Sequence, residues 1–462
     1  MDDIGTGHVE LDHGGISAMS SRMSRTASAV IRAALLCLGV FAAANGPARA
    51  ADPVYDYPID DPFAATVVGT PTSQQAPLNV PSSIGENYLD ARPDRDYPDI
   101  FWYTRKMRYL VALQDHPAPL AFVISGTGSN HKSISTVALA FALFDQGAHV
   151  VTLPSPTHPN FIVAASRYSR PGSTDDDVSD LLDVMTQIRD ELVDDGARID
   201  GYLITGYSMG AFHAAVVAEA DSRLHRFDFD KVMLVNPPVS LYESAKRLDA
   251  MLLEGIPGGM LHFNEFYSKF MQGFADVYVE ARDIDLTGDF LYDIYKEREI
   301  KGEDIDFKAL IGLSFRLSAA NLIFTTDVMN RADYVVPANV ELGTSTSLTD
   351  YFKVCAQLDF NDYITELFLP LVKKQKPPGI LEQLVDKASL RSIEPYLRNS
   401  PNVALMTNAD DVILGDGDIQ WFEDVFGDRA KIWPNGGHLG NLRHHSFIDY
   451  FKGFFTIGGE GK

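Results

Sequence analysis

The chain has 462 residues, of which 45% are apolar and 11% aromatic, so it is long and apolar enough to bury a sizeable core. Its 39 lysine and arginine residues against 63 aspartate and glutamate residues give a formal net charge of −24, which argues against nucleic acid as a partner because an acidic surface repels phosphate. The two cysteines, Cys37 and Cys355, are too few for a disulfide framework. One large domain with an insertion, or two domains, is expected.

Residues 1–50 contain, in order, the features that a secretory signal requires. Arg25 and Arg32 precede an apolar stretch from Ala33 to Ala44, and a small-residue cleavage site ends at Ala50. The stretch is shorter than the roughly 18 apolar residues of a membrane-spanning helix. We therefore expect cleavage after Ala50, a periplasmic or secreted location, and no stable membrane span in the mature chain.

A signal normally begins close to its basic residues, whereas the first 22 residues are polar and glycine-rich. Met19 and Met23 are therefore alternative candidates for the translation start. After the signal, residues 51–96 are rich in proline, aspartate and serine and show little periodicity, which predicts an extended lead-in over the surface.

From residue 97 onward, short apolar runs alternate with amphipathic helices of ten or more residues. Runs of this kind without polar alternation are typical of buried parallel strands, so the sequence predicts an α/β fold with a mostly parallel sheet and helices on both faces. The predicted strands are Leu120–Ser125, His149–Leu153, Tyr202–Thr205, Val232–Asn236, Val403–Thr407 and Lys431–Trp433.

Between the fourth and fifth of these strands the rhythm changes to helical spacing, as in Leu248, Met251 and Leu252. Residues 241–400 are therefore predicted to be a mainly helical insertion into one core domain formed by 97–240 and 401–462. Its large apolar residues have two readings: they form the insertion's own core, or they line an acyl pocket. They include Phe263, Phe266, Tyr267, Phe270, Phe274, Phe315, Leu322 and Phe324.

The pentapeptide Gly206-Tyr207-Ser208-Met209-Gly210 follows one predicted strand directly and opens a helix of small residues. A serine on so sharp a strand-to-helix turn is held with its Oγ exposed, and the flanking glycines avoid collisions with strand and helix. The sequence here resembles the α/β-hydrolase superfamily, in which the triad runs serine, acid, histidine along the chain. The resemblance covers about 119–240 and 400–455.

The resemblance implies an acid in a loop after a later strand, and Asn408-Ala409-Asp410-Asp411 follows the strand Val403–Thr407. In the family the acid commonly stands three residues after a turn-forming glycine or asparagine, which selects Asp411, with Asp410 as the alternative. The histidine is expected after the last strand, where the glycine-rich loop ending in His438 lies. His438 would act as the base and Asp411 would orient it.

The turn Ser125-Gly126-Thr127-Gly128 follows an early strand, as the oxyanion loop of the family does, so the backbone N–H groups of Thr127 and Met209 are candidates for the oxyanion hole. A phosphate cradle is the alternative, but the turn lacks the phosphate-binding glycine patterns. His131, His158 and Tyr207 are candidate substrate contacts.

The leading functional hypothesis is a carboxylic-ester hydrolase that acts on a small-molecule or lipid-like ester through an acyl-enzyme. A peptidase or an acyltransferase would use the same residues, and a binding protein that has lost catalysis is the alternative from another class. The sequence shows no metal-ligand spacing, so we expect neither a metal nor a cofactor. His213, five residues after Ser208, is expected to pack or to bridge to a neighbour. The oligomeric state is left open.

Overall fold

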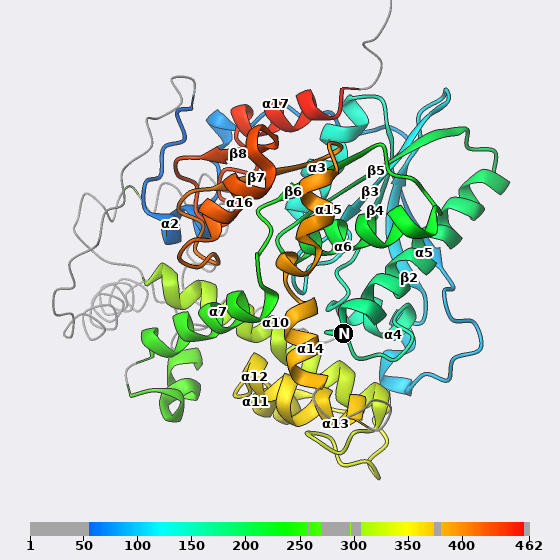
Figure 1. Ribbon diagram of the computed structural model, residues 1–462. Helices are drawn as coiled ribbons and strands as arrows, with labels where there is room; N and C mark the ends of the chain where they lie inside the picture. The colour runs from blue at the N-terminus through cyan, green and yellow to red at the C-terminus, as the bar shows by residue number, and fades with distance from the viewer. Residues whose placement is uncertain (1–54, 257, 269–295, 297–305, 374–379, 457–462) are drawn as a thin grey trace, which may run out of the picture.

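The computed structural model describes residues 55–256, 258–268, 296, 306–373 and 380–456. Its centre is an eight-stranded sheet in the order β1-β2-β4-β3-β5-β6-β7-β8, in which β2 runs antiparallel to both neighbours and the other pairs are parallel (Figure 1). The strands are β1 Gly85–Leu89, β2 Met107–Ala112, β3 Ala118–Ile124, β4 His149–Leu153, β5 Ile199–Tyr207, β6 Lys231–Val235, β7 Val403–Asn408 and β8 Ala430–Trp433.

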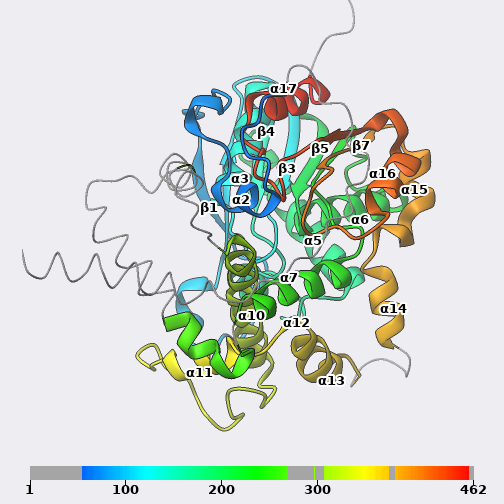
Figure 2. The same cartoon turned by 90° about the vertical axis from the view of Figure 1, so that its left-hand side faces the viewer.

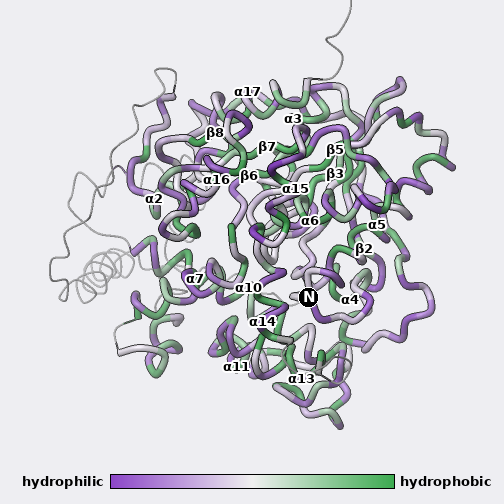
Figure 3. The backbone as a smooth tube through the Cα atoms, viewed as in Figure 1, coloured by the Kyte–Doolittle hydropathy of each residue, from purple (hydrophilic) through white to green (hydrophobic). Residues whose placement is uncertain are grey.

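The predicted α/β fold with a mostly parallel sheet is confirmed, and all six predicted strands are present with ends that shift by up to three residues. The prediction missed β1 and β2, the two strands at the antiparallel edge of the sheet. Figure 3 shows hydrophobic residues concentrated along the central strands, as expected for strands covered on both faces.

Helices cover both faces of the sheet because side chains alternate along each strand (Figure 2). In β3, Phe122 faces a core shared with α5 and α6, whereas Val123 faces a second core shared with α3 and α17. The core helices are α3 Ile134–Asp145, α4 Pro159–Ala164, α5 Thr174–Asp194, α6 Met209–Leu224, α15 Glu394–Asn399, α16 Asp418–Phe426 and α17 His445–Phe454, with the short helices η2 Asp99–Thr104, η5 Leu390–Ile393 and η6 Gly427–Arg429.

The described residues between β6 and β7 contain helices and no strand. The elements are α7 Leu241–Gly255, η3 Met260–His262, α10 Phe307–Asn330, α11 Thr349–Cys355, α12 Phe360–Asp362, the π-helix η4 Tyr363–Phe368, α13 Leu369–Lys373 and α14 Ile380–Lys387. This insertion leaves and rejoins the core at one neck, where Ser240 and Ser389 form an antiparallel bridge. Leu241 N donates to Ala388 O and Leu390 N to Val239 O, so η5 and α15, which were predicted within the insertion, pack on the core.

The long helix α10 forms the centre of the insertion. Its Arg316 is 1% exposed and donates to Asp249 of α7, with Nη2 3.0 Å from Oδ1. Among the described residues, α10 is also the one helix that is long and apolar enough to cross a membrane, but half of its most apolar window is buried inside the protein. The buried ion pair and this packing describe a core helix.

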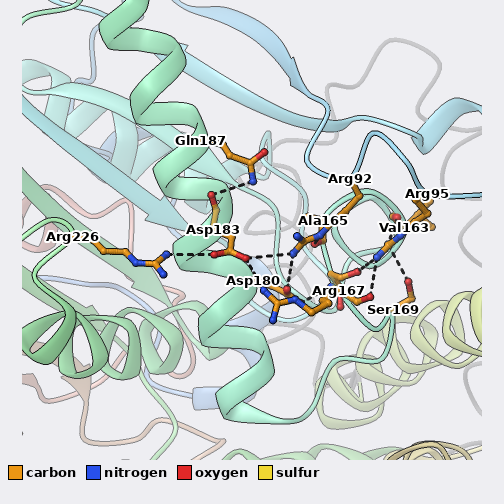
Figure 4. A network of polar contacts seen from close by, with 11 residues as sticks. Arg92, Arg95, Val163, Ala165, Arg167, Ser169, Asp180, Asp183, Gln187 and Arg226 are labelled. Carbon is orange, nitrogen blue, oxygen red and sulfur yellow. Dashed lines mark hydrogen bonds and ion pairs between the residues drawn. The ribbon is translucent and has the colours of Figure 1, made fainter.

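The lead-in is more ordered than the sequence predicted, because it contains α2 Pro62–Val68, η1 Thr72–Gln74 and β1. Its later part is anchored by two arginines that reach the region of α4 and α5 (Figure 4). Arg92 donates to Ala165 O and to Asp180, at 2.9 Å from Oδ1, while Arg95 donates to Val163 O and Ser166 O. Burial raises the pKa of the Asp180 carboxyl to about 6.

Candidate active site

Ser208 lies on the turn between β5 and α6 in a strained conformation, with φ of 54° and ψ of −128°. The turn is possible because both flanking positions are glycine. A Cβ on Gly206 would lie 2.3 Å from Gly210 O, and a Cβ on Gly210 would lie 2.1 Å from Ile124 O. The two glycines therefore let strand, turn and helix meet closely enough to project the serine at the carboxyl edge of the sheet.

Three side chains that are distant in the sequence form one hydrogen-bonded chain at this edge. His438 Nε2 lies 2.9 Å from Ser208 Oγ, and His438 Nδ1 lies 3.0 and 3.1 Å from the two carboxylate oxygens of Asp411. Because Nδ1 faces the carboxylate, the ring proton belongs on Nδ1, and Nε2 is left to accept the serine proton. The side chain of Asp411 is fully buried and that of His438 is 13% exposed.

The strand order, the antiparallel β2, the nucleophile turn after β5, the acid after β7 and the histidine after β8 together decide the fold. This is the α/β-hydrolase fold. No protein-family model matches the chain, and no curated protein sequence is similar to it.

Several solved structures of this fold are distantly similar. A putative hydrolase from Legionella pneumophila is 13% identical, with a TM-score of 0.42 over 86% of this chain and 96% of that chain. A hyperthermophilic esterase from the archaeon Pyrobaculum calidifontis is 12% identical, with a TM-score of 0.39 over 96% and 97%. An esterase from Pyrococcus furiosus is 10% identical, with a TM-score of 0.37 over 82% and 93%. At such identities the likeness extends to the α/β-hydrolase fold alone.

Asn236, which sequence reasoning did not single out, supports the acid. It directly follows β6. Its Nδ2 donates to Asp411 Oδ2 at 2.8 Å, while Ile413 N donates to Asp411 Oδ1 at 3.2 Å. These donors fix the carboxylate opposite the His438 ring.

Asp410, the alternative acid, has a different place in this fold. Its two carboxylate oxygens accept hydrogen bonds from Gly436 N at 3.1 Å and Gly437 N at 2.9 Å, in the loop that carries His438. Burial is the main reason why the pKa of the Asp410 carboxyl rises to about 6. Asp410 thus holds the backbone of the histidine loop, whereas Asp411 contacts the histidine ring.

The lead-in holds the other side of the same loop, which the sequence did not reveal. Thr66 Oγ1 accepts a hydrogen bond from His438 N at 2.8 Å and donates one to Pro62 O at 2.6 Å. Close approach is possible because position 437 is glycine: a Cβ there would lie 2.1 Å from Pro62 O. The partners are 372 residues apart, and no local sequence signal announces the contact.

The oxyanion candidates Thr127 and Met209 both border the cavity that contains Ser208. Among the described residues, neither backbone N–H group has a hydrogen-bond partner. The loop that presents Thr127 is fixed by Gly128 N, which donates to Thr157 Oγ1 at 2.9 Å. Two unpaired donors beside the nucleophile are what an oxyanion needs.

The cavity beside Ser208 is covered by the insertion. It is lined by residues of α7, α10, α14 and the α12–η4 segment, and most of these are apolar. Of the apolar residues singled out in the sequence, Phe315 and Leu322 line the cavity, whereas Phe263 and Phe324 pack in the insertion's own core. The described members of the set are thus divided between the cavity wall and the insertion's own core, and the acyl pocket stays a prediction. Phe270 and Phe274 lie outside the described residues.

His131, His158 and Tyr207 are not among the described residues that line this cavity, and their role as substrate contacts stays a prediction. His131 Nε2 lies 2.8 Å from Glu86 Oε1 of β1. His158 caps α4, since its Nδ1 accepts from Asn160 N, and burial lowers its pKa to about 4. The Tyr207 ring packs against Gly126 beneath the oxyanion loop. His131 and His158 both border a second pocket, which does not contain Ser208.

Among the described residues, one aspartate and two histidines lie close enough together to be considered as metal ligands, although the sequence shows no metal-binding motif. Asp56 Oδ1 lies 3.2 Å from Nε2 of both His444 and His445. However, His444 Nδ1 accepts a hydrogen bond from Ser446 N, which places the ring proton on Nε2. That tautomer has no lone pair on Nε2 for a metal ion, and the rings of His444 and His445 lie within ion-pair distance of the Asp56 carboxylate.

Proposed function

We propose that this α/β hydrolase is an exported serine esterase, with Ser208 as the nucleophile, His438 as the general base and Asp411 as the orienting acid. The observation that carries the proposal is the continuous hydrogen-bonded chain from Asp411 through His438 to Ser208 Oγ. All three contacts lie within 3.1 Å, so the geometry suits proton transfer without rearrangement.

In the proposed reaction, Ser208 Oγ attacks the ester carbonyl carbon while His438 Nε2 takes the hydroxyl proton. The negative oxygen that forms is met by the N–H groups of Thr127 and Met209, and Asp411 stabilises the imidazolium. Collapse of the intermediate breaks the bond to the alcohol, which leaves with the proton from Nε2. Water then attacks the acyl-serine by the same steps and releases the acid.

An ester with an apolar acyl group fits the cavity, because its walls are predominantly apolar and it opens onto Ser208. The same triad also serves peptidases and acyltransferases. These alternatives differ in the bond that is attacked and in whether water resolves the acyl-enzyme. Rates on p-nitrophenyl esters, aminoacyl amides, and esters with an added alcohol acceptor separate the three.

Export is part of the proposal and is supported by the sequence alone, because residues 1–54 lie outside the described residues. The basic residues, the apolar stretch and the small-residue site at Ala50 support it. N-terminal sequencing of periplasmic or secreted protein should begin at Ala51. An intact Met1, Met19 or Met23 on cytoplasmic protein contradicts export and leaves the esterase proposal untouched.

The decisive test of the chemistry is labelling with a fluorophosphonate, which reacts with an activated serine. We expect a single adduct on Ser208, identified by peptide mass spectrometry, and no adduct in Ser208→Ala. Ser318→Ala is the matched control, because Ser318 lines the same cavity and its Oγ bonds only Ser314 O within its own helix. An adduct on another serine, or none on folded protein, overturns the proposal.

A further inference from the structure

We propose that the cavity binds an acyl chain that carries a hydroxyl group, which hydrogen-bonds with Asp177 and His213. This inference rests on the proposed esterase function and names the class of acyl group. It starts from an aspartate and a histidine that stand in a predominantly apolar wall. Both border the cavity that contains Ser208.

The two side chains come from neighbouring helices of the core. Asp177 lies in the first turn of α5, and His213 lies on α6, five residues after the nucleophile. Their side chains are 8% and 2% exposed, and His213 Nε2 is 3.9 Å from Asp177 Oδ2. That separation is longer than a hydrogen bond, so the two side chains do not satisfy each other's hydrogen-bonding groups.

Counting hydrogen bonds shows what the pair lacks. Asp177 Oδ2 accepts from Gly172 N at 2.9 Å. His213 Nδ1 is buried and has no hydrogen-bond partner among the described residues. A buried polar atom without a partner is unfavourable, so the described residues alone do not satisfy the polar groups of this part of the wall.

The chemistry of the missing partner follows from the tautomer of His213. Because Nε2 is the nitrogen nearer to Asp177, the ring proton belongs on Nε2, and Nε2 can donate to a group that lies between the two side chains. The Asp177 carboxylate is an acceptor, so that group must accept from His213 Nε2 and donate to Asp177. A hydroxyl group does both and remains uncharged inside an apolar cavity, whereas a second carboxylate on the substrate would be repelled by Asp177.

The position of the subsite places the hydroxyl away from the ester carbonyl. His213 follows Ser208 by five residues, which corresponds to roughly 8 Å along the helix axis. A chain bound between them passes apolar walls that include Leu241, Phe315 and Leu322. The hydroxyl is therefore expected in the middle or at the end of a medium-length chain, and not next to the carbonyl.

The test compares p-nitrophenyl octanoate with its analogues hydroxylated at the third, sixth or eighth carbon, using the purified full-length protein. We expect kcat/KM to be about tenfold higher with the hydroxyl at the sixth or eighth carbon than for the plain ester, and to show no gain at the third. Equal or lower values at every position overturn the inference. This comparison uses the wild-type protein, so it does not depend on the folding of a variant.

Variants then locate the effect. His213→Leu should abolish the preference for the hydroxylated chain, measured as the ratio of kcat/KM for the two esters, while His213→Gln, which keeps a polar atom, should retain part of the preference. Leu384→Ala is the matched control, because it removes apolar wall and should lower both rates in the same proportion. A preference that survives His213→Leu in folded protein overturns the assignment of this residue.

The outcomes also separate this inference from the proposed function. If neither ester is hydrolysed and Ser208 is not labelled, the esterase proposal fails, and this inference fails with it. If the plain ester is hydrolysed and the hydroxyl brings no gain, the esterase stands and the hydroxyl subsite alone is refuted.

Discussion

The contact between the lead-in and the histidine loop gives the most direct prediction. Thr66→Val keeps the shape of the side chain and removes both hydrogen bonds of the hydroxyl, from His438 N and to Pro62 O. The pairing of the base with Ser208 then depends on a loop that has lost one of its supports. We expect kcat to fall with little change in KM, because Thr66 is not among the described residues that line the cavity.

The magnitude follows from the cost of leaving a backbone N–H group without a partner, about 1–3 kcal/mol when it is fully buried. This hydrogen bond is part-buried, so water replaces some of the loss and about 1–2 kcal/mol is a better range. If that energy is spent in the transition state, kcat falls roughly 5- to 30-fold. Asp410 still holds the other side of the loop, which limits the loss.

The assay is the steady-state rate on a short p-nitrophenyl ester, together with the rate of fluorophosphonate labelling and the melting temperature. Thr66→Ser is the control, because it keeps the hydroxyl and should restore most of kcat. A Thr66→Val protein with wild-type kcat, or a Thr66→Ser protein as slow as Thr66→Val, would refute the reasoning. A loss confined to KM would show that the lead-in affects binding and not the base.

Three further predictions concern buried charges. Asp411→Asn should lower kcat at saturating ester about 10³- to 10⁴-fold, because the His438 ring loses its orienting acceptor. Asp410→Asn should lower kcat no more than about tenfold, and the reverse order of the two effects would exchange the roles of the two residues. Burial, helped by nearby His445, lowers the pKa of His444 to about 4. Between pH 6.5 and 4 the folded state therefore binds fewer protons at His444 than the unfolded state does, so the stability that the neutral His444 contributes is lost on acidification. The control is His444→Asn, which keeps an acceptor for the N–H of Ser446. In urea titrations from pH 6.5 to 4, the wild type should lose up to about 3 kcal/mol of unfolding free energy relative to this variant. A difference between the two proteins that stays constant over this pH range contradicts the prediction. Arg316→Met should lower the unfolding free energy by about 3–5 kcal/mol because Asp249 stays buried without its ion partner, and a change below about 1 kcal/mol would show that the pair is dispensable.

The sequence predicted those parts of the fold in which a physical constraint produces a recognisable local pattern of residues. Strands buried on both faces appear as short continuous apolar runs, and the turn at Ser208 requires small neighbours for steric reasons that any sequence must obey. Strand β1 has no such mark, because it lies at the sheet edge, where its residues from Gly85 to Tyr88 are half-buried or exposed and Leu89 alone is buried. Polar edge strands resemble loops in a single sequence.

The site divides in the same way. Ser208 and His438 could be predicted because each follows a strand in a glycine-rich turn, which is a local pattern. The choice between Asp410 and Asp411 could not be made from residue types, because it depends on which carboxylate the loop directs to the ring and which to the backbone. The role of Thr66 depends on a contact across 372 residues, which only the folded chain defines.

The neck at Ser240 and Ser389 has a consequence for how this protein can be altered. Both chain crossings lie side by side, paired through Leu241 with Ala388 and through Val239 with Leu390, so the core is interrupted at a single point. A turn of a few residues could replace 241–388 without stretching the strands on either side. The insertion is therefore joined to the sheet as a single unit, and a different insertion grafted at this neck would leave the order and register of the strands unchanged.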